Sequence, residues 1–175
     1  MIHETESHAT ANLHAPVVVV RGDGHFRVLT TRPFAEGEVV LRLEGREVRR
    51  PTRYTIQIDR DLHLESEPGE GFEAALDRRP WRFLNHSCRP VTRLVGRDLV
   101  ALRPLAAWEQ VTFDYNTTEV TLAAPFACRC GAEDCCGVVR GFTALDDAGR
   151  RRRAPLLASH LATVDQDLER ADGAR

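Results

Sequence analysis

The fold is decided by one stretch of the chain, Arg82-Phe83-Leu84-Asn85-His86-Ser87-Cys88-Arg89-Pro90. An Asn-His pair on its own is typical of a polar turn and predicts little. Here the pair is followed, 24 residues after Pro90, by Asp114 and Tyr115, which close the run Val-Thr-Phe-Asp-Tyr. An isolated Phe-Asp-Tyr is likewise more often the end of a strand, so the joint occurrence of the two segments is the informative observation.

Short strands surround this stretch on both sides. Runs rich in β-branched residues alternate with glycine and proline, a pattern that predicts many short strands and a mainly β fold. An acidic, glycine-containing segment from Glu65 to Arg79 predicts an insertion with one short helix. The predicted strands are Val17 to Val20, His25 to Thr30, Val39 to Leu43, Tyr54 to Ile58, Val91 to Val95, Leu99 to Leu102 and Val111 to Phe113.

The composition predicts one domain with a small appendage. The 175 residues are 42% apolar, enough for a core, and the net charge of −2 argues against direct, general binding to nucleic acid. No apolar stretch approaches the roughly 20 residues that cross a bilayer, and the first residues do not resemble a signal peptide. We therefore expect an intracellular, for example cytoplasmic, protein without a membrane partner. The oligomeric state is left open.

All 24 basic residues are arginine, so the chain contains no lysine. Codon bias in a GC-rich genome is a sufficient explanation. The run Arg150 to Arg153 is the one strongly cationic segment, and we interpret it as the solvated lead-in to a helix.

The two ends of the chain differ from the middle. Residues 1–15 are polar and without periodicity, which predicts a flexible leader. Near the other end, four apolar residues recur at spacings of four, three and four, which predicts an amphipathic helix that packs on the domain or on a partner. These four are Leu157, Leu161, Val164 and Leu168.

The cysteines are odd in number, and four of the five lie within nine residues. This clustering favours metal binding over a secreted disulfide framework. Free reduced thiols without a metal are the alternative.

With these motifs in place, the chain resembles the SET family. The family's hallmarks are an R-F-x-N-H-S-C-x-P segment and a later F-D-Y, matched by residues 82–90 and 113–115. Gly22-Asp23-Gly24-His25-Phe26 is similar to the opening G-x-G-L-F motif, and the segment from Phe34 to Val40 is similar to the G-E-V-I strand. Cys128-x-Cys130-x4-Cys135 resembles the post-SET motif. The resemblance covers roughly Val17 to Phe142, which is most of the chain, with four separate motifs in family order.

The resemblance implies an architecture and a division of the chain. The implied fold consists of several small β-sheets, with the segment from Asn85 to Cys88 threaded through a loop as a pseudoknot, a zinc-binding post-SET loop and a C-terminal helix. We expect the SET domain at 16–120, the post-SET segment at 121–142 and the amphipathic helix within 143–175.

The resemblance also implies a cosubstrate, S-adenosyl-L-methionine, and residues that bind it. Methyl transfer requires an uncharged nitrogen aligned with a sulfonium and shielded from water. Tyr115 is the expected catalytic residue at the transfer centre, and it also contacts the cofactor. The remaining expected cofactor-binding residues are Gly22, Asp23, Gly24, His25, Phe26, Arg82, Asn85 and His86.

A narrow aromatic channel is expected to receive the substrate. Tyr54 matches a strand that often carries a second catalytic tyrosine, and ordinary packing on a half-buried strand is the alternative. Phe113 stands where the family tunes the number of methyl groups, and a phenylalanine there implies that di- or trimethylation is permitted. Trp108 replaces the usual glycine before Glu109, which leaves the geometry of that turn open.

Structural zinc is the expected metal. Three thiolates can come from Cys128, Cys130 and Cys135, and the resemblance implies Cys88 as the fourth ligand. Cys136 stands where the family usually has arginine, and we interpret it as a bystander. The metal would hold the post-SET loop over the active site.

The predicted function is therefore transfer of a methyl group to the side-chain amine of lysine in a protein or peptide. Two alternatives stay open. One is an enzyme of the same chemistry acting on a small amine or a peptide intermediate, and the other is a non-catalytic SET module that binds a partner.

Overall fold

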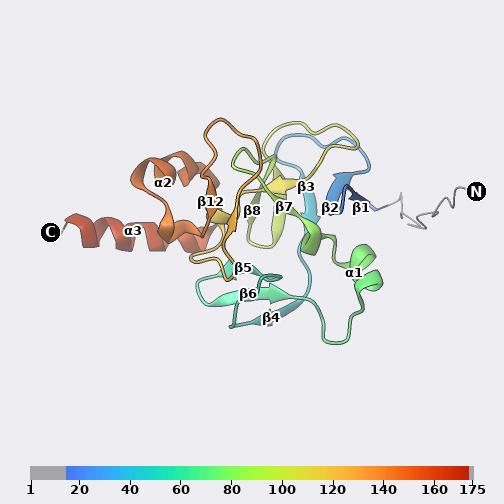
Figure 1. Cartoon of the computed structure of the whole chain (residues 1–175), viewed down its shortest axis with the longest axis horizontal. Coiled ribbons are helices and arrows are strands. Elements are labelled where there is room, and N and C mark those ends of the chain that lie inside the picture. Colours follow the sequence, from blue (N-terminus) through green and yellow to red (C-terminus); the bar gives the residue numbers. More distant parts are fainter. Residues whose placement is uncertain (1–14, 174–175) are drawn as a thin grey trace, which may run out of the picture.

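The computed structural model describes residues 15–173 and consists of small β-sheets with few helices (Figure 1). The predicted mainly β fold is confirmed. Strands β1 (Val17–Gly22) and β2 (His25–Thr30) form an antiparallel hairpin. A second sheet has the order β3-β9-β8, and a third has the order β4-β6-β5. Their strands are β3 (Val39–Arg42), β4 (Arg46–Val48), β5 (Ile56–Asp59), β6 (Leu62–Glu65), β8 (Thr92–Val95) and β9 (Asp98–Ala101).

A short parallel pair joins the two segments that the sequence singled out. Strand β7 (Asn85–His86) runs beside β10 (Thr112–Phe113), with Asn85 opposite Thr112 and His86 opposite Phe113. The Ser87 backbone N–H extends this ladder by donating to the Phe113 carbonyl over 3.1 Å. This pairing places the two segments of the expected pseudoknot side by side.

One predicted strand is shorter than expected. The strand predicted from Tyr54 begins only at Ile56, because a turn precedes it: the Thr52 N–H donates to Thr55 Oγ1, and the Thr55 N–H and hydroxyl both donate to the Thr52 carbonyl. Tyr54 therefore lies in a loop and is 54% exposed, so ordinary packing on a half-buried strand does not describe it.

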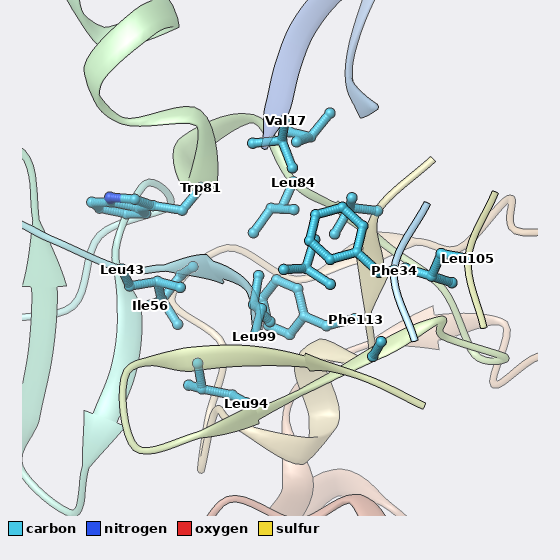
Figure 2. Close-up of a cluster of buried hydrophobic side chains, with 14 of the residues drawn as sticks. Val17, Phe34, Leu43, Ile56, Trp81, Leu84, Leu94, Leu99, Leu105 and Phe113 are labelled. Carbon is cyan, nitrogen blue, oxygen red and sulfur yellow. The ribbon is translucent and has the colours of Figure 1, made fainter. Parts of the chain in front are cut away.

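The hydrophobic core lies where the sheets meet (Figure 2). The side chain of Phe113 reaches this core from β10, while Trp81 closes one side and donates its indole N–H to the Glu44 carbonyl over 2.9 Å. The segments on both sides of the site are thus anchored by buried apolar side chains. The labelled core residues are Val17, Phe34, Leu43, Ile56, Trp81, Leu84, Leu94, Leu99, Leu105 and Phe113.

Two turns of the fold have the same geometry. Phe34 and Leu105 form an antiparallel bridge, and each is followed by a turn closed by a glutamate. Glu38 accepts from the Ala35 N–H over 2.9 Å, and Glu109 accepts from the Ala106 N–H over 3.0 Å. The residue before the glutamate has a positive φ in both turns, +80° at Gly37 and +64° at Trp108. The tryptophan therefore adopts the glycine conformation, and the turn is retained.

Helices are short until the end of the chain. The expected helix within Glu65 to Arg79 is α1 (Phe72–Arg78), followed by the 3-10 turn η1 (Pro80–Phe83). After η2 (Tyr115–Thr117) and the β11–β12 pair come η3, α2, η4 and α3. Their bounds are Phe126–Ala127 for β11, Val138–Val139 for β12, Phe142–Ala144 for η3, Asp147–Arg153 for α2, Ala154–Leu156 for η4 and Ser159–Gly173 for α3.

The C-terminal segment is thus several helical pieces. Leu157 lies outside α3, in the extended residue after η4, whereas Leu161 is fully buried at the beginning of α3. The rest of α3 extends away from the sheets, at the left of Figure 1. Among residues 15–173, no helix is long and apolar enough to cross a bilayer. The expected leader, residues 1–15, lies almost entirely outside the described residues.

Candidate active site and thiol cluster

A cavity of about 940 Å³ lies where the two motif segments meet. Most of its wall comes from residues within 52–56, 81–87, 110–115 and 122–130, and His25, Arg27 and Glu119 complete it. The loop before β5, η1 with β7, β10 and the cysteine-rich loop thus all border the cavity. Asn85, His86, Phe113 and Tyr115 line it together. The structure therefore brings most of the predicted site residues to one cavity.

Tyr115 is held at this cavity by its hydroxyl and by its ring. The hydroxyl donates to the Leu84 carbonyl over 2.6 Å. The ring packs against Phe113 with centroids 4.8 Å apart and against Phe126 at 6.0 Å. Burial, and secondarily the nearby Glu119, raises the pKa of the Tyr115 phenol, so it stays protonated at neutral pH. Its proton is committed to Leu84, and its oxygen lone pairs can accept a further hydrogen bond.

His86 connects Tyr115 to the cysteines. Its Nδ1 accepts from the Tyr115 backbone N–H over 3.2 Å, and its Nε2 lies 3.3 Å from Cys88 Sγ. Burial lowers the pKa of His86, so the ring is neutral and carries its proton on Nε2. Both ring nitrogens are thereby engaged, and a cofactor would meet the backbone of His86. Asn85 is also fixed, because its Nδ2 donates to the Phe26 carbonyl over 2.7 Å.

Asp114 is held by a buried ion pair that the sequence analysis missed. Arg153 of α2 donates from Nε to Asp114 Oδ2 over 2.6 Å, and Asp114 Oδ1 accepts from the N–H and from Nδ2 of Asn116. The prediction that residues 150–153 form a solvated helix lead-in is wrong for Arg153, which is only 4% exposed. A sequence signal exists, because Gly149 and Arg153 are four apart and share a helix face, and both are buried.

A second buried carboxyl, Glu119, also escaped the sequence analysis. Its Oε1 accepts from the Gln57 N–H over 2.7 Å, and its Oε2 lies 3.9 Å from His63 Nε2. Gln57 in turn accepts from the Val120 N–H over 2.8 Å. Burial raises the pKa of Glu119 to about 7, although the hydrogen bond from Gln57 opposes this. No local motif marks Glu119, because its environment is made by β5, 60 residues earlier.

Four thiols form the cluster expected for a metal. The sulfurs of Cys88, Cys128, Cys130 and Cys135 all lie within 4.8 Å of one another. Sulfurs around tetrahedral zinc are about 3.8 Å apart, given Zn–S bonds of about 2.3 Å, and Cys88 and Cys128 are 4.0 Å apart. The cluster can therefore hold structural zinc, and His86 would donate to one of its ligands as an outer partner.

Cys136 lies outside that group of four. Its sulfur is 3.5 Å from Cys88 Sγ and 3.9 Å from Asn116 Nδ2. Burial raises the pKa of Cys88, and the proximity of Cys136 adds to this, so the bare thiol resists ionisation. A divalent cation removes that resistance by binding the thiolate.

The predicted cofactor segment near β1 and β2 reaches the cavity at one point. His25 lines the wall. Gly22 ends β1, Asp23 and Gly24 form the turn to β2, and none of these three residues lines the cavity. Gly24 has φ +77°, which explains the glycine by backbone conformation. Phe26 packs on Phe83 and Phe72. The role of this segment in binding stays a prediction.

The other predicted residues lie on the cavity wall. Arg82 lines it beside Tyr54, with the guanidinium 5.7 Å from the tyrosine ring centroid. Tyr54 and Tyr115 thus both lie at the cavity, the first exposed and the second partly buried. Their catalytic roles stay predictions.

Comparison with known proteins agrees with this architecture. No protein-family model matches the chain. A histone-lysine N-methyltransferase of Yarrowia lipolytica, described as H3 lysine-36 specific, is 30% identical over 140 residues, which are 71% of this chain and 18% of that protein. The methyltransferase flvH of Aspergillus flavus is 36% identical over 86 residues, 45% of this chain and 44% of that protein. The chain thus spans less than half the length of these relatives.

Solved structures give the same result for the fold. A crystal structure of KRYPTONITE in complex with mCHH DNA, H3(1-15) peptide and SAH superposes with a TM-score of 0.52 and 21% identity, over 70% of this chain and 29% of that one. A second KRYPTONITE structure, with mCHG DNA and SAH, has a TM-score of 0.51. Fold, motif order and relatives together show that the chain belongs to the SET-domain family.

Proposed function

We propose that the chain is an S-adenosylmethionine-dependent methyltransferase that acts on the side-chain amine of lysine in a protein. The observation that carries the proposal is that Tyr115, whose hydroxyl is fixed by the Leu84 carbonyl, lines one cavity together with Asn85 and His86. The relatives described as histone-lysine N-methyltransferases, and the solved relatives bound to SAH, support the same chemistry.

The cavity fits the cosubstrate in size and lining. Its volume of about 940 Å³ lies at the upper end of small-molecule sites, which suits a cofactor together with one substrate side chain. S-adenosylmethionine, when bound, supplies a methyl carbon that the amine lone pair attacks while the carbon–sulfur bond breaks and the sulfur keeps the electron pair. Backbone groups of Asn85 and His86, with Arg82, would bind it.

The protein's own residues prepare the amine. An aromatic wall of Tyr115, Phe113 and Phe126 strips water from the lysine nitrogen, which lowers the lysine pKa and favours loss of a proton to solvent. The Tyr115 oxygen, whose own proton is held by Leu84, then accepts from the remaining N–H and turns the lone pair toward the methyl group. Alignment and exclusion of water supply the catalysis, and a strong base is not needed.

The number of methyl groups follows from the same wall. Phe113 is 3% exposed and packs on Tyr115, and it offers no hydroxyl that could hold a methylated amine in a fixed orientation. A dimethyl- or trimethyllysine product therefore belongs to the proposal.

The proposal also includes zinc as a structural ion. Cys88, Cys128, Cys130 and Cys135 would hold the ion, and the loop that carries the last three also lines the cavity with Cys128, Arg129 and Cys130. Holding this loop closes one wall of the substrate channel. An intracellular location stays part of the proposal.

The test compares the wild-type chain with Tyr115→Phe. We expect methyl transfer from labelled S-adenosylmethionine to proteins of a cell extract to fall at least about 100-fold, comparable to loss of one catalytic hydrogen-bonding group. Calorimetry should show cofactor binding within about threefold of wild type, since Tyr115→Phe removes only the hydroxyl. Mass spectrometry of the labelled proteins identifies the modified residue.

Each alternative predicts a different outcome. Label on small amines and none on proteins would replace the protein substrate by a small one. Calorimetry without any binding of S-adenosylmethionine to the wild type would contradict the enzyme and favour a non-catalytic module.

A further inference from the structure

The wall of the cavity is positively charged, although the whole chain has a net charge of −2. Arg27, Arg53, Arg82 and Arg129 all line it, and the single carboxyl among the lining residues is Glu119. Glu119 is 4% exposed, and burial raises its pKa to about 7, so it is only partly ionised at neutral pH. Among the lining residues, guanidinium groups thus outnumber carboxyl groups by four to one.

Little of this charge is neutralised locally. Arg27 lies 3.5 Å from Asp23, whose side chain is 86% exposed. Within residues 15–173, Arg53, Arg82 and Arg129 form no ion pair. The guanidiniums of Arg53 and Arg82 instead lie 5.2 Å and 5.7 Å from the ring centroid of Tyr54. An exposed tyrosine flanked by two unpaired guanidiniums leaves their hydrogen-bond donors directed to solvent or to a ligand.

The four arginines divide between two parts of the site. Arg82 is predicted to bind the cofactor, and Arg27 directly follows the segment from Gly22 to Phe26, for which the same role is predicted. Arg53 precedes Tyr54, which is predicted for the substrate channel, and Arg129 lies between the thiols Cys128 and Cys130 of the loop that lines the cavity. Both Arg53 and Arg129 are exposed. They are therefore the two cations that the residues flanking a bound lysine would approach.

Arg53 and Arg129 together form a cationic rim of the cavity, and this rim discriminates between peptides by their charge. A peptide with arginine or lysine beside the reactive lysine would bring like charges together, which opposes binding, whereas carboxylates would form bidentate contacts with guanidinium groups. Specificity here includes repulsion of the wrong ligand as well as attraction of the right one.

We propose that the substrate is an acidic segment of a protein, in which aspartate or glutamate residues flank the methylated lysine and bind Arg53 and Arg129. This inference rests on the proposed function for the methyl transfer itself. The recognition of negative charge by the rim can be measured separately as binding.

The test uses three peptides of equal length with one central lysine, flanked by Asp and Glu, by Ser and Gly, or by Arg. Binding to the full chain is followed by fluorescence anisotropy, and methyl transfer by mass spectrometry of the peptide. Because the chain contains no lysine, every methyllysine detected belongs to the peptide. We expect the acidic peptide to bind at least about tenfold more tightly than the arginine peptide, and the difference to shrink with added salt.

Charge reversal at the rim makes the test specific. Arg53→Glu should remove most of the preference for the acidic peptide, and Arg53→Gln should remove part of it. Arg129→Glu gives an independent second position. The matched control is Arg49→Glu, which changes the net charge equally at an exposed arginine outside the cavity wall and should leave the preference unchanged. Thermal melting of each variant shows that it is folded.

The outcomes separate this inference from the proposed function. Preferential binding of the acidic peptide, lost in Arg53→Glu, supports the inference even if no peptide is methylated, and in that case the proposed function alone fails. Equal binding of the three peptides, tighter binding of the arginine peptide, or no binding at all would overturn it. An unchanged preference in both Arg53→Glu and Arg129→Glu would also overturn it.

Discussion

Arg153 Nε lies 2.6 Å from Asp114 Oδ2, and the two side chains are 5% and 1% exposed. This contact joins α2 to the residue directly before Tyr115, over 39 positions of sequence. Asp114 also caps η2 by accepting from the Asn116 N–H, so the same carboxylate fixes the beginning of the turn that carries Tyr115. A helix outside the motifs therefore supports the geometry of the candidate site.

Removal of the Arg153 guanidinium should destabilise the folded protein. Arg153→Met leaves Asp114 buried without its cation, and we expect the free energy of unfolding to fall by about 3 kcal/mol or more. Urea denaturation followed by circular dichroism measures the change. Arg152→Met is the control, because Arg152 is exposed and its loss should change stability by no more than about 0.5 kcal/mol. Equal effects at both positions would show that the buried pair has no special role.

Replacement of Trp108 by glycine should stabilise the folded protein. A left-handed conformation costs a non-glycine residue about 1 to 2 kcal/mol, partly offset by the roughly 0.5 to 1 kcal/mol of extra chain entropy that glycine loses on folding. Since Trp108 has φ +64° and is 57% exposed, Trp108→Gly should raise the free energy of unfolding by up to about 1 kcal/mol.

The turn that contains Gly37 has the same geometry, and there the reverse substitution, from glycine to a larger residue, should destabilise the protein. Gly37 has φ +80°, so Gly37→Ala should lower stability by about 1 kcal/mol. Chemical denaturation of both variants measures whether each substitution raises or lowers the free energy of unfolding. A clear loss of stability in Trp108→Gly would mean that contacts of the indole outweigh the backbone strain.

Glu119 should make stability depend on pH. Its folded pKa of about 7 lies above the usual 4.5, so the folded state binds the proton more tightly, and the contribution of Glu119 to stability falls as pH rises through this window. The pKa values of His63 and His160 are lowered by burial, and these residues act in the opposite direction below pH 6.5. Comparison with Glu119→Gln isolates the carboxyl from both histidines.

The unfolding free energies of the wild type and of Glu119→Gln should therefore diverge as the pH rises. We expect nearly equal unfolding free energies at pH 4, where the glutamate is neutral, and an advantage for Glu119→Gln of up to about 3 kcal/mol at pH 8, from the conversion of about 1.4 kcal/mol per pKa unit. Urea titrations at a series of pH values measure it. A difference that does not vary with pH would contradict the raised pKa.

Metal content tests the thiol cluster. The purified chain should contain one zinc ion, which Cys128→Ser should lose, whereas Cys136→Ser should retain it because Cys136 lies outside the group of four. Elemental analysis measures the content, and a strong chelator should lower the melting temperature of the wild type. Loss of zinc in Cys136→Ser would make Cys136 a ligand.

Several features were readable from the sequence because they are local. Segments with alternating β-branched residues and glycine turns predicted the small sheets, and the spacing of Cys128, Cys130 and Cys135 predicted that these thiols would converge. The one short helix expected between Glu65 and Arg79 is α1. Tyr54 was placed on a strand in error, because the hydrogen bonds of the turn between Thr52 and Thr55 delay the strand.

The order and spacing of residues by themselves determined the mainly β class of fold and the supply of soft metal ligands, since periodicity and turn chemistry act over a few residues. The meeting of residues 85–88 with 113–115 was expected only from the resemblance to the SET family, because the two segments are far apart in the sequence. Only the tertiary structure decided which charges are buried and which remain free at the site. The pairing of Arg153 with Asp114, the protonation of Glu119 and the unpaired guanidiniums beside Tyr54 depend on burial and distance between segments far apart in the chain. Electrostatic energies depend on position within the folded molecule, and composition does not contain that position.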